Sequence, residues 1–188
     1  ELLVPLNFRR QPHGRVVKIL GEAMAPGMEV DVAIHNHDIP NAWPAALLAE
    51  MKHVKSRVLE KDKLGRRDCR DFDFVTIDGE DAKDFDDAIF CEFSDHGFHL
   101  KVAIADVSFY VKEGSALDLE AAKRTTSVYM PKKVVPMLPE KLSNELCSLQ
   151  PNKRRRCLCI EMDFDKDGYI NSYKFHRGII KSVARLTY

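Results

Sequence analysis

The chain of 188 residues lacks the features of a membrane or secreted protein. It has no apolar run that approaches the ~18–20 residues of a membrane span. Its first residues, 1–5, are too few and lack the basic start of a signal peptide. The five cysteines are odd in number and include no C-x-x-C pair, which argues against a secreted disulfide framework. We therefore expect a cytoplasmic protein with no membrane partner.

Net charge is also absent, because 29 Lys and Arg residues balance 29 Asp and Glu residues. The charges are nevertheless unevenly distributed. Acidic residues concentrate in 71–87, whereas basic residues cluster at 9–10, 132–133 and 153–156. A protein that binds and cuts a polyanion needs cations for the backbone and carboxylates for a metal, in separate places. The alternative is that the basic clusters are solvated faces.

The composition, with 45% hydrophobic and 31% charged residues, predicts a soluble globular fold. The length allows one medium domain, or one small domain and part of another. The chain begins without Met and ends abruptly at 186–188. We expect it to be an excised piece of a longer, monomeric protein.

The first part of the chain predicts a small β domain. Residues 2–6, 14–19 and 28–34 have the composition of short strands and are separated by turn-rich stretches. They are too few for a complete barrel. We therefore expect 1–37 to be the C-terminal part of an OB-like β-barrel.

Residues 38–73 predict a connecting helix and a linker. Asn41 can cap a helix that continues to about Arg57, with Pro44 tolerated in its first turn. Residues 58–73 are polar and mixed in charge, which favours a linker.

From Phe74 onward the pattern predicts an α+β domain, an antiparallel β-sheet with flanking helices over 74–188. Ser115 and Asp118 form a capping box that starts a helix to about Lys123. The sequence Lys166-Asp167-Gly168 favours a hairpin turn. The expected strands are 74–77, 88–93, 98–111, 157–164 and 169–179, with a short helix at 139–148.

The segment 78–87 carries the chemistry, because six of its ten residues are carboxylates. Two unit charges 4 Å apart repel by ~1 kcal/mol in water and by ~4 kcal/mol at an effective dielectric constant of 20. Such a cluster is costly unless cations neutralise it. Carboxylate oxygens suit Mg²⁺ or Mn²⁺, and two such ions could activate water and stabilise a leaving oxygen. A structural cation or an acidic binding loop remain alternatives.

A resemblance to a known family enters at this segment. Residues 74–88, FVTIDGEDAKDFDDA, resemble the signature of the ribonuclease II/ribonuclease R family, the RNB exoribonucleases. Further motifs follow in family order: VAIADVS at 102–108, TSVYMP at 126–131, VPMLP at 135–139 and LSNELCSL at 142–149. The likeness is closer to the bacterial ribonuclease R branch than to ribonuclease II.

The resemblance implies a domain organisation. Residues 1–37 would be the end of the second cold-shock domain, and 38–73 the connection that follows it. Residues 74–188 would be the first part of the RNB catalytic domain. The later half of that domain, and an S1 domain, would lie beyond the chain.

The resemblance also implies a function. It predicts a processive, Mg²⁺-dependent exoribonuclease, with Mn²⁺ possible, that degrades single-stranded RNA from the 3′ end to nucleoside 5′-monophosphates. Asp78 and Asp87 would be direct metal ligands, and Asp84 would complete the metal site. Asp86 would order the attacking water or a second ion. Asp84 and Asp86 are thus the expected catalytic residues.

Two RNA-binding residues follow from the same resemblance. Tyr129 would stack near the 3′-terminal nucleotide, a contact that tolerates any base. The alternative for Tyr129 is that it fills the core. Arg155 falls on a basic position near the RNA path.

Other interpretations remain at this stage. The chain could bind RNA without cutting it, because the rest of the active site is missing, or it could be an acidic metal binder. The pattern Asp163-x-Asp165-x-Asp167 matches the start of a Ca²⁺-binding loop, but Lys174 stands where a glutamate is needed, so we predict a hairpin turn. Asp106 could be structural, or it could support the metal site.

Overall fold

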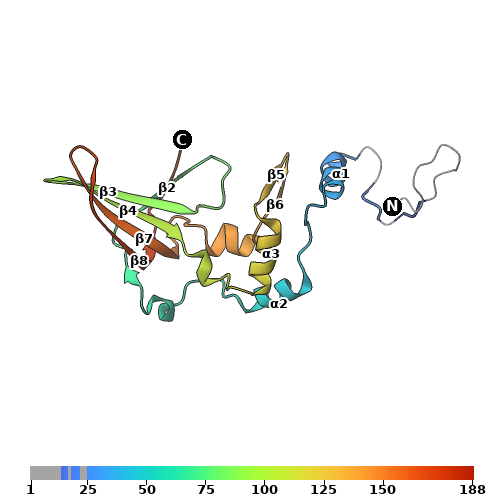
Figure 1. Ribbon diagram of the computed structural model, residues 1–188, viewed down its shortest axis with the longest axis horizontal. Coiled ribbons are helices and arrows are strands. Elements are labelled where there is room, and N and C mark those ends of the chain that lie inside the picture. Colours follow the sequence, from blue (N-terminus) through green and yellow to red (C-terminus); the bar gives the residue numbers. More distant parts are fainter. Residues whose placement is uncertain (1–13, 17, 22–24) are drawn as a thin grey trace. The chain divides into compact units, whose positions relative to one another are not determined.

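The computed structural model describes residues 14–16, 18–21 and 25–188, and Figure 1 shows the course of the chain. The chain divides into two compact units. The first comprises 1–42 and 128–135, and the second comprises 43–127 and 136–188. Among the described residues, no helix is long and apolar enough to cross a membrane.

The first unit contains a helix, α1 (Met28–Asn36), and a hairpin of β5 (Val128–Met130) and β6 (Lys133–Val135). Val30 and Ile34 lie one helical turn apart and are buried together with Val135. The ammonium of Lys133 pairs with the carboxylate of Asp31.

The predicted strand at 28–34 is therefore wrong, because these residues begin α1. Apolar and polar residues alternate at its start, which resembles a strand, but the buried pair Val30 and Ile34 has helical spacing. Gly27 precedes the helix with a φ of 89°, which glycine adopts without strain. The strand predicted at 2–6 lies outside the described residues. Within 14–19, the described residues form no strand beyond a single bridge at Gly14.

A seven-stranded sheet organises the second unit, with the order β1-β8-β7-β4-β3-β2-β9. All neighbours from β2 to β8 along this order pair antiparallel, whereas β1 and β9 add parallel at the two edges. This arrangement confirms the α+β class (Figure 1). The strands are β1 (Arg67–Asp68), β2 (Val75–Asp78), β3 (Asp87–Ser94), β4 (Gly97–Ala105), β7 (Arg154–Asp165), β8 (Ile170–Lys181) and β9 (Ala184–Thr187).

The turn between β7 and β8 is a hairpin, as predicted, and the carboxylate of Asp165 stabilises it. Oδ1 of Asp165 accepts hydrogen bonds from the amides of Asp167 and Tyr169, both at 2.9 Å. Gly168 has a φ of 87°. The aspartates of this segment therefore shape a turn between two strands, the structure expected in place of a Ca²⁺ loop.

The helices α2 (Ala45–His53) and α3 (Ala116–Arg124) lie together at one end of the sheet with the short π-helix η3 (Lys141–Leu146) (Figure 1). The hydroxyl of Ser115 caps α3 by accepting the amide of Asp118 at 3.2 Å. The carboxylate of Asp118 accepts the amide of Gly114 rather than that of Ser115. The buried side chains at this end of the sheet include Leu47, Met51, Leu117, Leu142, Leu146, Ala88 and Ala103.

The segment 58–73 contains more secondary structure and more buried residues than its polar composition indicates. It contains the 3₁₀ helix η1 (Glu60–Lys63) and the edge strand β1, and the side chain of Cys69 is fully buried. Three charged residues of this segment form ion pairs with side chains of β7: Glu60 with Arg154, Asp62 with Arg156, and Arg67 with Glu161.

Asp106 is a paired structural carboxylate. The strand predicted at 98–111 ends at Ala105, and the 3₁₀ helix η2 (Val107–Phe109) follows. Asp106 is 8% exposed and accepts hydrogen bonds from the guanidinium of Arg66 and, at 2.9 Å, from the hydroxyl of Ser108. Because Asp106 is buried and paired with these donors, its role is structural, and it does not support the metal site.

Candidate active site

The acidic loop connects two neighbouring strands of the sheet. β2 ends at Asp78, β3 begins at Asp87, and the loop spans 79–86. Val75 pairs with Ile89, so the two strands lie side by side and bring both ends of the loop to the same end of the sheet. The carbonyl of Asp86 accepts the amide of Ala105 at 2.8 Å, which ties the loop to β4.

The buried hydroxyl of Ser148 fixes the backbone in the middle of the loop. Its hydroxyl accepts the amide of Phe85 at 3.1 Å and donates to the carbonyl of Lys83 at 2.8 Å. The amide of Leu149 donates to the carbonyl of Phe85 at 2.8 Å. Phe85 itself is only 5% exposed and packs into the core. Because Phe85 points inward, its neighbours Asp84 and Asp86 are held at the surface of the domain.

Arg185 of β9 fixes the first turn of the loop. Its guanidinium donates to the carbonyls of Gly79, at 2.8 Å, and Glu80. The same group lies over the ring of Phe85, 5.1 Å from its centre. β9 follows the hairpin of β7 and β8 and pairs with β2, the strand that leads into the loop. The end of the chain therefore supports the loop.

A cavity of about 310 Å³ lies beside the loop. Asp84 and Asp86 form its acidic wall. The remaining walls are apolar or small side chains: Ile104, Ala105, Val107, Ser127, Met137, Leu138, Ser143 and Cys147. A mostly apolar lining with a small number of polar groups is the usual form of a small-molecule site.

The electrostatics of the loop are those of crowded like charges. Burial, followed by the charges of Asp87 and Asp84, raises the pKa of Asp78. Burial, followed by the charges of Asp84, Asp78 and Asp87, raises the pKa of Asp86. The charges of the neighbouring aspartates therefore disfavour the charged forms of Asp78 and Asp86 unless a cation is present.

These residues fit a divalent cation by their chemistry. Oδ2 of Asp78 is buried and has no hydrogen-bond partner among the described residues, although a buried carboxylate oxygen usually has one. Within the described part of the chain, no group of three or more His, Cys, Asp or Glu side chains is gathered tightly enough to hold a metal. Asp84 and Asp86 line the cavity, whereas Asp78 and Asp87 are not part of its lining. Carboxylate oxygens are the donors that Mg²⁺ prefers, and waters and substrate would have to complete its shell.

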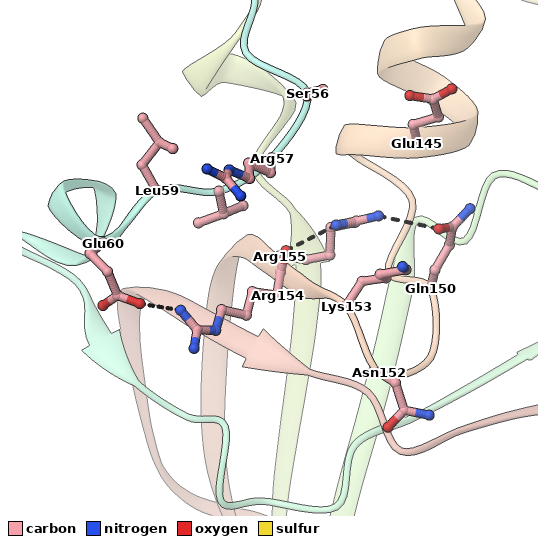
Figure 2. Close-up of a pocket in the computed structure, with 11 residues that line it drawn as sticks. Ser56, Arg57, Leu59, Glu60, Glu145, Gln150, Asn152, Lys153, Arg154 and Arg155 are labelled. Atoms are coloured by element: carbon pink, nitrogen blue, oxygen red, sulfur yellow. Dashed lines mark hydrogen bonds and ion pairs between the residues drawn. The ribbon is translucent and has the colours of Figure 1, made fainter.

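The two predicted RNA-binding residues have different surroundings. Tyr129 lies on β5 of the first unit and is 69% exposed, so it does not fill the core. Arg155 is 8% exposed and donates to the carbonyl of Ser148 at 2.7 Å. It also donates to the side-chain oxygen of Gln150 at 3.2 Å (Figure 2).

Sequence reasoning missed Ser148 and Arg185. A serine between Cys147 and Leu149, in an apolar stretch, was the available signal for a buried hydroxyl. Arg185 gave no signal, because the parallel pairing of β9 with β2 joins residues more than a hundred positions apart.

Comparison with known proteins identifies the family. Residues 66–188 match the RNB domain, and residues 4–44 match a cold shock domain. The chain belongs to the RNB domain family. The RNB match includes the aspartate loop, Ser148 and Arg185.

Relatives of this RNB chain are ribonucleases by name. It is 55% identical over 180 residues to Ribonuclease R of Acidithiobacillus ferrooxidans, a match that covers 96% of the chain and 41% of the relative. It is 50% identical over 189 residues to Ribonuclease R of Escherichia coli K12, a match that covers 100% of the chain and 23% of the relative. The chain therefore spans less than half the length of these relatives.

Solved structures agree with the RNB assignment. RNase R of Mycoplasma genitalium in complex with double-stranded RNA is 37% identical, with a TM-score of 0.83 over 90% of this chain and 30% of that one. The yeast pseudonuclease Ssd1 is 22% identical, with a TM-score of 0.73 over 100% of this chain and 24% of that one, and it shows the fold alone.

Proposed function

We propose that the protein containing this chain is a divalent-metal-dependent 3′→5′ exoribonuclease that hydrolyses RNA to nucleoside 5′-monophosphates. The observation that supports this most is the aspartate loop itself. The charges of Asp84 and Asp87 add to burial in raising the pKa of Asp78 and of Asp86, within the part of the chain that matches the RNB domain. A cluster that is unfavourable alone and chemically suited to a cation indicates a metal site.

The four aspartates would hold Mg²⁺, with Mn²⁺ possible. Bound there, such an ion neutralises charge on a phosphate and supplies an acidic water. The chain's own residues then orient the reactants. Asp78 would offer the buried, unpartnered Oδ2, and Asp86, which lines the cavity, would accept a hydrogen bond from the attacking water. Ser148 and Arg185 keep the loop in place.

The cavity supports an RNA end as the substrate. Its volume of about 310 Å³ is at the lower end of ligand sites and suits a single terminal nucleotide. Its apolar wall contains Ile104, Val107 and Leu138, which can contact any base or sugar without selecting a sequence. We propose that Tyr129, an exposed residue of the first unit, stacks on the RNA, and that the protein acts as a cytoplasmic monomer on single-stranded RNA. Arg155 would act through the basic cavity described below.

A second candidate is an RNA-binding piece without catalytic activity. The chain spans 41% or less of the Ribonuclease R relatives described above, so residues beyond it could be needed for turnover. The fold is shared with a pseudonuclease, which is compatible with this alternative.

One experiment separates the two candidates. The full-length protein and this chain are incubated with single-stranded RNA in Mg²⁺, in Mn²⁺ or in EDTA. One RNA is labelled at the 5′ end, to follow shortening from the 3′ end, and another is labelled uniformly, to detect released mononucleotides. The proposal expects the full-length protein to release mononucleotides and shorten the RNA stepwise from the 3′ end, only with a metal. RNA binding without mononucleotide release by this chain, next to release by the full-length protein, would support the second candidate for the chain. No release by the full-length protein would contradict the first candidate.

A further inference from the structure

A second and larger cavity, of about 730 Å³, lies in the same unit as the aspartate loop. The π-helix η3 contributes to both cavities, with Ser143 lining the acidic one and Glu145 the larger one. Figure 2 shows the side chains of the larger cavity, which come from the segment before β1, from η3, from the loop that follows η3 and from the start of β7. We call it the basic cavity because of its charges.

Cations outnumber carboxylates in the basic cavity. Its lining includes the four cations Arg57, Lys153, Arg154 and Arg155, against Glu60 and Glu145. Arg154 pairs with Glu60, as the dashed line in Figure 2 shows. Arg57 and Lys153 are exposed, and the described residues provide no ion-pair partner for either.

Arg155 is a buried cation without a carboxylate partner among the described residues, which indicates an anionic ligand. It is more than nine-tenths buried, yet it donates only to the carbonyls of Ser148 and Arg154 and to the amide oxygen of Gln150. Glu145, in the same lining, makes no ion pair with it. A buried charge without a counter-ion is costly, and proteins usually pair it.

Other arginines in the same unit follow that rule. Three have nearly inaccessible side chains, with 5% or less exposed, and each pairs with a carboxylate. The pairs are Arg66 with Asp106, Arg124 with Glu120, and Arg156 with Asp62. Arg155 is the exception among the described arginines that are buried, and it is the one that lines a cavity with further unpaired cations.

We propose that the basic cavity binds phosphate groups of an RNA strand, at a site separate from the aspartate loop. Arg57 and Lys153 contact the phosphates, and the buried guanidinium of Arg155 supplies the fixed positive charge behind them. RNA as the source of the phosphates rests on the proposed function. The lining contains no aromatic side chain, so the cavity recognises the backbone and leaves the bases unread.

Arg57 and Lys153 are the residues to change. Replacing Arg155 would also remove its hydrogen bond to Ser148, and Ser148 holds the aspartate loop. The double variant Arg57→Ala/Lys153→Ala removes two exposed cations and leaves that connection intact. A matched control is Lys166→Ala/Lys174→Ala, which removes two exposed cations from the hairpin of β7 and β8.

The test measures affinity for a single-stranded RNA as a function of salt. Each protein is full length and also carries Asp86→Asn, so that the RNA is not consumed. The proposal expects the double variant to bind RNA on the order of 10-fold more weakly at 0.1 M salt. The slope of log affinity against log salt should fall by about 1.4, from two contacts at ~0.7 each. The control should match the parent in both.

Three results would overturn the proposal. One is an unchanged slope in a double variant that melts at the same temperature as the parent. Another is an equal loss of slope in the control, which would indicate unspecific attraction. The third is that the cavity binds inorganic phosphate and not RNA. In that case the double variant would lose phosphate binding but would bind RNA as well as the parent does.

Failure of this site and failure of the proposed function give different results. Mononucleotide release by the protein with Asp86 intact tests the function. Salt-dependent RNA binding by the double variant tests the cavity. An inactive protein whose RNA affinity still depends on Arg57 and Lys153 would contradict the function and support the cavity.

Discussion

The hydroxyl of Ser148 holds the backbone of Phe85 at 3.1 Å and, through its own proton, the carbonyl of Lys83 at 2.8 Å. One fully buried side chain thus satisfies two backbone groups of the acidic loop. The aspartates on either side of Phe85 depend on this contact for their position, although Ser148 does not line their cavity.

Replacing Ser148 with alanine should therefore loosen the loop. The buried amide of Phe85 and carbonyl of Lys83 would lose their partner, which destabilises the fold by about 1–3 kcal/mol. We expect mononucleotide release by the full-length protein to fall and the required metal concentration to rise. Urea unfolding and a metal titration of activity check both effects.

Ser172→Ala is the control for Ser148→Ala, because the hydroxyl of Ser172 is exposed and binds only Asp163. If both variants kept full activity at the original metal concentration, Ser148 would have no positioning role. A loss of stability with unchanged metal dependence would also contradict that role.

Arg185→Met should release the first turn of the loop. The change removes the donors to the carbonyls of Gly79 and Glu80 and keeps an unbranched side chain against Phe85. We expect weaker metal activation with little change in RNA affinity, because Arg185 acts on the loop that carries the aspartates. Lys181→Met, at the exposed end of β8, is the comparison, and equal effects of the two would contradict this assignment.

The pair of Asp106 and Arg66 should make stability depend on acid pH. Burial alone would raise the pKa of Asp106, but the hydrogen bonds from Arg66 and Ser108 outweigh it, and the pKa is lowered. A carboxyl with a lowered folded pKa contributes stability above its unfolded pKa, near 3.8, and loses it as the pH falls through the folded value.

Asp106→Asn should therefore destabilise the chain at pH 7 by about 3–5 kcal/mol, since Arg66 stays buried without its partner. The difference from the parent should shrink as the pH falls below the unfolded pKa of Asp106. Urea unfolding across this pH range measures it. A difference that stayed constant with pH would show that the ion pair contributes nothing.

A divalent ion should stabilise the fold. Mg²⁺ that binds only the folded aspartate loop adds about 2.7 kcal/mol at a concentration 100 times its Kd. We expect the melting temperature to rise with Mg²⁺ and to return to the starting value in EDTA, and Asp78→Asn to weaken the response. An equal rise in that variant would place the stabilising ion elsewhere.

Much of the β structure could be predicted from the sequence. The apolar run at 88–91 and the turn Lys166-Asp167-Gly168 are local signals, and the strands that they predict are present in antiparallel pairs. The acidic loop was also visible, because six carboxylates between two apolar strands are conspicuous at the level of composition.

Other features depend on contacts that are distant in the sequence. β1 is only two residues long, and its place beside β8 is set by pairing across more than a hundred residues. The hydroxyl of Ser148 and the guanidinium of Arg185 likewise reach the loop only after the sheet has formed. The alternating start of α1 misled the prediction because a short helix can carry apolar residues at both spacings.

The most direct test of the central claim compares Asp86→Asn with Asp81→Asn in the full-length protein. Asp86 lines the acidic cavity, whereas Asp81 is an exposed residue of the same loop that lies outside the cavity lining. Mg²⁺-dependent release of mononucleotides from single-stranded RNA is measured at equal RNA occupancy. The proposed role of Asp86 predicts a loss of about 100-fold or more for Asp86→Asn, with RNA binding retained, and near-parent activity for Asp81→Asn. Full activity of Asp86→Asn would contradict it.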